Sequence, residues 1–124
     1  MRICFFGQRL YTAMITAERL DWRYPLDGSI EPVDLDGNTQ RRLLEVLDAL
    51  QLRMGIFDMK LADEGQPVWF EVNPQGQFLF LEGLCGMPLT HSCAEFLMEE
   101  ASGVRVLSRG MIPLFEEGYY DQLR

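Results

Sequence analysis

The chain has 124 residues, a formal net charge of −8 and 48% hydrophobic residues. This length fits one domain with a real core, and the composition excludes an intrinsically disordered protein. The acidic balance argues against general nucleic-acid binding, which depends on Lys and Arg side chains that neutralise phosphates.

The three cysteines lie far apart, at positions 4, 85 and 93, and the only histidine is His91. An odd number of cysteines without a C-x-x-C pair is typical of neither a disulfide framework nor a zinc site. We therefore expect a reducing, cytoplasmic location. No run of 18 apolar residues is present, which argues against a membrane span.

The first third of the chain predicts strands and then loop. Apolar and β-prone residues predict two strands, over residues 2–6 and 10–16. Asp, Pro and Gly are frequent over residues 17–37, which predicts mostly loop with room for one short strand. Leucine and valine then recur at helical spacings and predict a helix over residues 39–52, with Asn38 or Thr39 as its N-cap.

Two further strands are expected over residues 55–61 and 67–73. The short apolar segment 78–81 is followed by Gly83, Gly86 and Pro88, which break regular structure. A second helix is expected from Thr90 or Ser92 to about residue 100, with Phe96 and Leu97 facing inward, and residues 104–107 suit a short strand. The fold class predicted for the single domain 1–124 is α+β, an antiparallel sheet packed by about two main helices.

The 55–61 and 67–73 strands separate polar from apolar side chains, because successive side chains of a strand point to opposite faces. Alternation places Phe70 in the core with the other apolar residues of its face. The side chains expected on the opposite, polar face include Asp58, Lys60, Trp69, Glu71 and Asn73.

Register sharpens this pattern if Glu64-Gly65 is a two-residue hairpin loop. The opposite pairs are then Asp58 with Glu71, Ile56 with Asn73, and Lys60 with Trp69. Like charges directly opposite each other destabilise a sheet, and a divalent cation would remove that cost. Carboxylate and amide oxygens suit Mg²⁺, so the pattern predicts a metal site. The alternative is a plain solvated sheet face on which Lys60 neutralises a neighbouring acid.

The strings around these residues resemble the metal-binding motifs of ATP-grasp ligases. Glu71-Val72-Asn73-Pro74 is an E-x-N-P motif that follows Asp58 by 13 positions. Its continuation over residues 73–82 is similar to the N-P-x-G-Q-[FW] segment of ATP-grasp enzymes that macrocyclise ribosomal peptides of the microviridin (graspetide) type. Residues 2–15 resemble the opening hairpin of that family, and Asp21-Trp22-Arg23 matches a segment just after it. The resemblance covers about residues 2–100.

The resemblance implies that Asp58, Glu71 and Asn73 hold two Mg²⁺ ions on the phosphates of ATP. It implies a carboxylate–amine or carboxylate–hydroxyl ligase that works through an acyl-phosphate, and it leaves the catalytic residues unassigned. The further candidates for nucleotide or phosphate binding are Lys60, Arg2 and Arg9. The alternative for Lys60 is pairing with an acid, and the alternative for Arg2 and Arg9 is a plain surface position. Gly76 is expected to serve a tight turn through a positive φ.

The same resemblance implies a C-terminal ATP-grasp subdomain without the N-terminal and lid domains. We therefore expect the chain to be inactive alone, and whether it is an enzyme stays open. The expected partners are ATP, a carboxylate-bearing substrate such as a peptide, and either the missing half or a second copy. The alternative is a non-catalytic binding or oligomerising module, which an exposed apolar patch over residues 78–84 would support.

Overall fold

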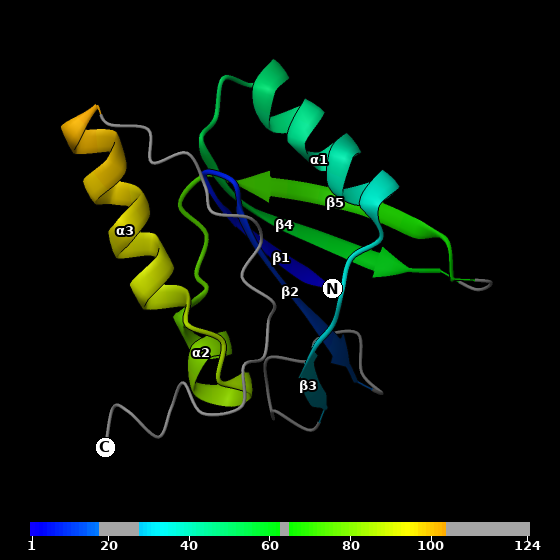
Figure 1. Cartoon of the computed structure of the whole chain (residues 1–124). Helices are drawn as coiled ribbons and strands as arrows, with labels where there is room; N and C mark the ends of the chain where they lie inside the picture. The colour runs from blue at the N-terminus through cyan, green and yellow to red at the C-terminus, as the bar shows by residue number, and fades with distance from the viewer. Residues whose placement is uncertain (18–27, 63–64, 104–124) are drawn as a thin grey trace.

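The computed structural model describes residues 1–17, 28–62 and 65–103. The elements in chain order are β1 (Arg2–Phe6), β2 (Arg9–Thr16), β3 (Ser29–Pro32), α1 (Gly37–Ala49), β4 (Met54–Leu61), β5 (Pro67–Asn73), α2 (Leu79–Cys85) and α3 (Leu89–Ser102) (Figure 1). The strands form one antiparallel sheet in the order β3-β2-β1-β4-β5. The predicted α+β class is confirmed. In the described part of the chain, no helix is long and apolar enough to cross a membrane.

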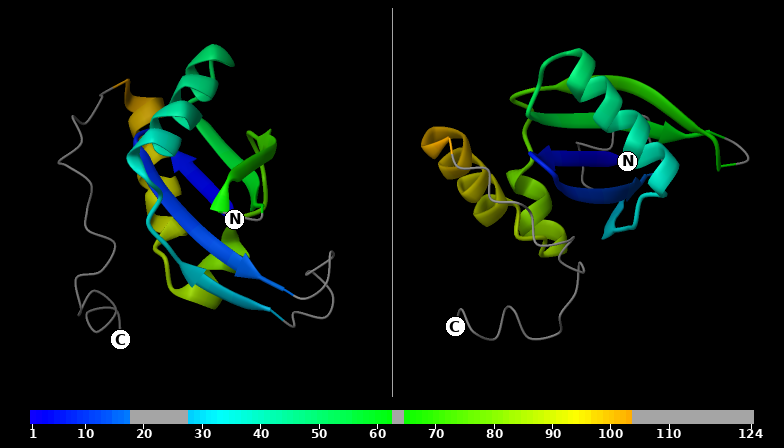
Figure 2. Two further views of the ribbon diagram at one scale, coloured as in Figure 1. Left: turned by 90° about the vertical axis from the view of Figure 1, so that its right-hand side faces the viewer. Right: turned by 45° about the horizontal axis from the view of Figure 1, so that its top comes forward.

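Helices cover both faces of the sheet (Figure 2), and each face carries a hydrophobic core. Helix α1 covers one face, where Leu43 and Leu47 pack with Phe5 and Phe57. Helices α2 and α3 cover the other face, where buried residues of both helices pack with Cys4, Phe6, Tyr11 and Ile56. The central strand β1 is therefore buried on both sides over residues 3–6, which explains its continuous apolar sequence.

Helix α1 starts and ends earlier than the expected range of 39–52. Its N-cap is Asp36, whose carboxylate accepts bonds from the backbone N–H groups of Asn38 (3.1 Å) and Thr39 (2.9 Å). Hydrogen bonds from Thr39 and its neighbours hold the pKa of Asp36 below its ordinary value. The helix ends where Gln51 takes a φ of 56°. The N–H of Leu52 then bonds the carbonyl of Leu47 (2.8 Å), which closes the last turn.

The segment that follows β5 contains helix α2, which the sequence did not predict. Gly83 locally disfavours a helix. Leu81 is fully buried, however, and its packing in the core stabilises this short helix. Gly86 ends the helix with a φ of 70°. Glu82 joins α2 to the next helix, because its carboxylate accepts bonds from the backbone N–H and the hydroxyl of Thr90, both at 2.6 Å.

Helix α3 differs from its expected form in two respects. It begins at Leu89 after Pro88, so neither Thr90 nor Ser92 is its N-cap. Leu97, expected to face inward, is 57% exposed. The family-like segment 21–23 and the short strand predicted over residues 104–107 lie outside the described residues.

Candidate metal site

The pairing of β4 with β5 brings the three predicted ligands to one end of the hairpin. Asp58 pairs with Glu71, and Ile56 pairs with Asn73, as the sequence predicts. Nearer the loop the register is different, because Lys60 pairs with Val68 and not with Trp69. That part of the register prediction was wrong, and so was the two-residue loop on which it rested.

A β-bulge explains why the prediction failed near the loop and held at the site. The register shifts between Asp58 and Met59, and Phe70 is the extra residue of β5. Continued from Leu61 and Pro67 without a shift, the pairing would place Asp58 opposite Phe70. The bulge instead puts Glu71 opposite Asp58. It thus sets the position of one candidate ligand.

The bulge also corrects two expectations about aromatic residues. Phe70 is 64% exposed and does not enter the core. Trp69 does not share the face of Glu71, because it pairs with Met59 and lies beside Phe57, with 6.4 Å between the ring centroids. Phe57 packs under α1, so Trp69 belongs to the face of the sheet that α1 covers.

Arg2 holds the Asp58 carboxylate from the neighbouring strand. The two residues are directly opposite each other in β1 and β4. The guanidinium donates from Nε to Oδ1 at 2.9 Å and from Nη2 to Oδ2 at 2.8 Å. The guanidinium carbon of Arg2 lies over the Phe80 ring of α2, 5.5 Å from the ring centroid. Arg2, Asp58 and Glu71 therefore form a row of one cation and two anions across three strands.

The remaining oxygens of the site are open to a ligand. Glu71 is exposed and has no hydrogen-bond or ion-pair partner within residues 1–17, 28–62 and 65–103. Asn73 Oδ1 accepts one bond from the backbone N–H of Gln75 (2.9 Å), which orients the amide and leaves a lone pair. Lys60 is exposed on the same strand as Asp58.

This donor set fits a hard divalent cation. Mg²⁺ commonly uses one or two carboxylates and completes its octahedron with water and substrate phosphates. No group of three or more His, Cys, Asp or Glu side chains suited to a metal occurs among the residues that the structure describes. Two carboxylates and an amide would therefore need oxygens from another molecule.

Gly76 lets the turn after Asn73 lie against the sheet. A Cβ at this position would be 2.9 Å from Cβ of Ile56 and 3.3 Å from Cβ of Asn73. The expectation of a positive φ was wrong, since Gly76 is not among the described glycines with positive φ. The residue is required for close approach of the backbone to a side chain.

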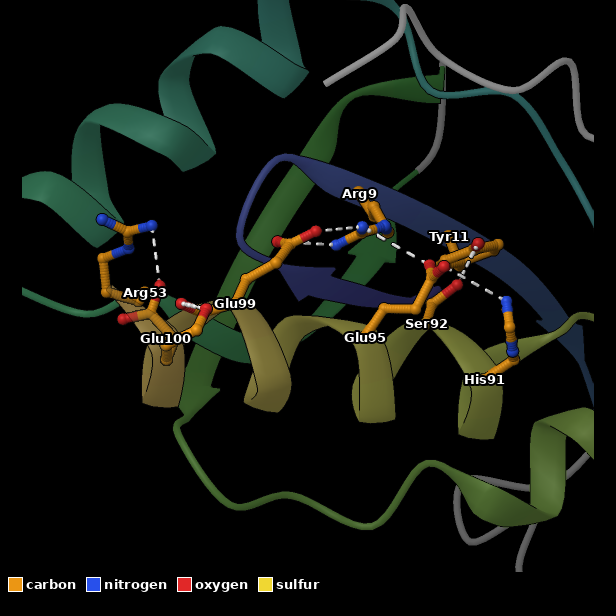
Figure 3. A network of polar contacts seen from close by, with 9 residues as sticks. Arg9, Tyr11, Arg53, His91, Ser92, Glu95, Glu99 and Glu100 are labelled. Carbon is orange, nitrogen blue, oxygen red and sulfur yellow. Dashed lines mark hydrogen bonds and ion pairs between the residues drawn. The ribbon is translucent and has the colours of Figure 1, made fainter. Parts of the chain in front are cut away.

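Arg9 lies at the opposite end of β1 and β2 from Arg2. Its side chain contacts acidic residues of α3 (Figure 3). Its guanidinium bonds Glu99 at 2.5 and 3.2 Å and forms an ion pair with Glu95 at 3.4 Å. The bond to Glu99 raises the pKa of Arg9. The structure therefore does not bring Arg9 to the other candidates.

Two further contacts along α3 belong to the same network. The Tyr11 and Ser92 hydroxyls are 2.6 Å apart in the core, and Arg53 Nη2 is 2.8 Å from Glu100 Oε1 (Figure 3). These contacts and the Arg2–Asp58 fork were missed by the sequence analysis. They join residues far apart in the chain, and no local pattern marks the partners.

Neither a protein-family model nor a curated protein matches the sequence. Solved structures do match it. The macrocyclase MdnC from Microcystis aeruginosa MRC, bound with precursor peptide MdnA, is 30% identical with a TM-score of 0.68, over 79% of this chain and 32% of that one. A Chryseobacterium gregarium RiPP-associated ATP-grasp ligase, in complex with ADP and a leader and core peptide, is 27% identical with a TM-score of 0.71, over 80% and 32%.

The ATP-grasp ligase PsnB, complexed with a phosphomimetic variant of its minimal precursor, Mg and ADP, has a TM-score of 0.68 over 81% of this chain and 31% of that one. Its identity of 15% supports the fold alone. The chain spans about a third of the length of these solved relatives. Over that third, the chain is a structural relative of the graspetide-type, RiPP-associated ATP-grasp ligases.

Proposed function

We propose that this chain is the C-terminal, metal- and phosphate-holding part of an ATP-dependent ligase that acts on a carboxylate of a peptide. The observation that supports this most is the pairing of Asp58 with Glu71, with Asn73 at the end of the same strand. The likeness to RiPP-associated ligases supports the peptide. In the proposed reaction, the carboxylate attacks the γ-phosphate of ATP and releases ADP. An amine or hydroxyl then attacks the acyl-phosphate, forms the amide or ester and releases phosphate.

Each residue has a distinct part in this proposal. Asp58 and Glu71 offer carboxylate oxygens from neighbouring strands, and Asn73 offers an amide oxygen oriented by the Gln75 N–H. Bound Mg²⁺ would neutralise charge on the ATP phosphates and align the displacement. Lys60 is the candidate for direct phosphate contact. Arg9 has no part, because Glu99 and Glu95 hold it.

The proposal predicts metal binding without ligase activity for the chain alone, because the relatives are about three times longer. The test is a Mg²⁺ titration, with and without a non-hydrolysable ATP analogue, followed by the backbone amide NMR signals of Asp58, Glu71 and Asn73. We expect these signals to move together and Glu71→Gln to weaken binding by at least about tenfold.

Glu31→Gln is the matched control, because Glu31 is also an exposed glutamate of an edge strand but lies in β3, at the opposite edge of the sheet. It should leave the titration unchanged. The proposal fails if the three amides stay still at saturating Mg²⁺ and analogue, or if both glutamine variants bind metal as the unchanged chain does.

Exposed leucines on α2 favour a second candidate function, association with another copy of the chain. Leu79 is 61% exposed and Leu84 is 49% exposed. Sedimentation of the full chain should then show a mass that rises with concentration, and Leu84→Ser should reduce that rise. A monomer at every concentration would exclude this candidate and leave the metal site untouched.

A further inference from the structure

We propose that Arg2 is a resident counter-cation of Asp58, which a metal ion must displace, and that Arg2 thereby sets the affinity of the metal site. This inference rests on the proposed function, because it concerns the same carboxylates. In this inference Arg2 acts on the metal site through Asp58 and needs no contact with a substrate.

The fork between the two side chains is the first reason. Arg2 engages both carboxylate oxygens of Asp58, and the side chains are only 17% and 31% exposed. A planar guanidinium matches a carboxylate in this bidentate geometry, which fixes the carboxylate plane. A cation that approaches the remaining lone pairs of Asp58 meets a positive charge already in contact with the same oxygens.

The charge count along the row is the second reason. Arg2, Asp58 and Glu71 follow one another across β1, β4 and β5, with a sum of −1. A divalent cation raises the sum to +1 when Arg2 is present, and to zero when Arg2 is replaced by a neutral residue. Competition for oxygens and the positive charge of Arg2 thus act in the same direction, against the metal.

A cation–π contact with Phe80 keeps the guanidinium of Arg2 near the site after a metal displaces it from Asp58. The ring of this α2 residue holds the guanidinium carbon at 5.5 Å from its centroid. A cation–π contact does not depend on the carboxylate, so it persists when the fork opens. Displacement therefore leaves a free guanidinium beside the metal site and does not expel Arg2 into solvent.

The test is Mn²⁺ binding to the full chain, measured from the EPR signal of free Mn²⁺. We expect Arg2→Gln to bind Mn²⁺ about five- to tenfold more tightly than the unchanged chain, the scale of one partly buried ion pair. Arg2→Lys keeps the charge but loses the fork, so its affinity should lie between the two. Arg53→Gln, which breaks the arginine–glutamate pair with Glu100 instead, should change nothing.

A second measurement uses the unchanged chain and needs no variant to fold. The Nε–H signal of Arg2 should shift during a Mg²⁺ titration with the same midpoint as the Glu71 amide. An Arg2 signal that stays still while Glu71 titrates overturns the inference, and so does Arg2→Gln with unchanged or weaker Mn²⁺ affinity. In both cases the proposed metal site survives. Absence of metal binding in every variant overturns the inference and the proposed function together.

Discussion

Replacement of Gly76 by alanine tests whether the turn after β5 is built on close approach. The turn runs from Asn73 to Gly76, whose N–H is 3.4 Å from the Asn73 carbonyl oxygen. An added methyl group would meet Cβ of Ile56 at 2.9 Å and its Cγ1 at 3.1 Å. Cβ of Ile56 is fixed by the backbone of a central part of β4, so the turn must move and the side chain cannot simply rotate away.

The expected magnitude is the difference between two effects. Overpacking by a methylene-sized group costs about 1–3 kcal/mol. Alanine also lowers the conformational entropy of the unfolded chain, which stabilises the folded state by about 0.4–1 kcal/mol. The midpoints of these two ranges differ by about 1.3 kcal/mol, and we expect Gly76→Ala to lower the free energy of unfolding by about that amount. A urea m-value of about 2 kcal/mol/M, the middle of the usual range of about 1–3, converts this to a midpoint lower by about 0.7 M.

The assay is urea unfolding followed by far-UV circular dichroism, with Gly83→Ala as the control. Gly83 lies in α2, and a Cβ there meets no atom within 4 Å. The same substitution should therefore stabilise the chain by about 0.5–1 kcal/mol, the opposite sign. If Gly76→Ala is neutral or stabilising, the close-approach argument is refuted. The Mg²⁺ affinity should also fall in Gly76→Ala, because Asn73 begins the displaced turn.

Three other predictions concern the sheet and α3. Tyr11→Phe should cost about 1–2 kcal/mol in urea unfolding because it leaves the buried Ser92 hydroxyl unpaired, and Ser92→Ala on that background should recover part of the loss. Burial raises the pKa of the Cys4 thiol to about 12, so iodoacetamide at pH 8 should alkylate the other two cysteines before Cys4, as read by mass spectrometry. Hydrogen bonding to Arg9 holds the pKa of Glu99 below its ordinary 4.5. Its stabilisation is therefore full above that pH and lost as the pH falls through the lowered pKa, so Glu99→Gln should flatten the acid side of a stability profile.

Local pattern was sufficient for the fold class and for the identity of the site strands. Alternation over residues 55–61 and the E-x-N-P string at the end of β5 both depend on neighbouring residues, which a single sequence contains. Helix α2 was missed because its packing comes from Leu81 in a tertiary core, against the local effect of Gly83. The exposure of Phe70 was missed because alternation assumes an uninterrupted strand.

The predicted pairing of Asp58 with Glu71 is correct, although the predicted loop is wrong. The β-bulge compensates for the different loop length. A longer loop alone would have aligned Asp58 with the apolar Phe70, and the bulge costs a ladder bond and exposes an aromatic ring. This arrangement lowers the stability of the fold, because it places Glu71 directly opposite a like charge. Arg2 offsets the repulsion at one end of the row only. The bulge places Glu71 opposite Asp58, and Glu71 has no partner among the described residues. This arrangement supports the proposed cation site over a plain solvated sheet face.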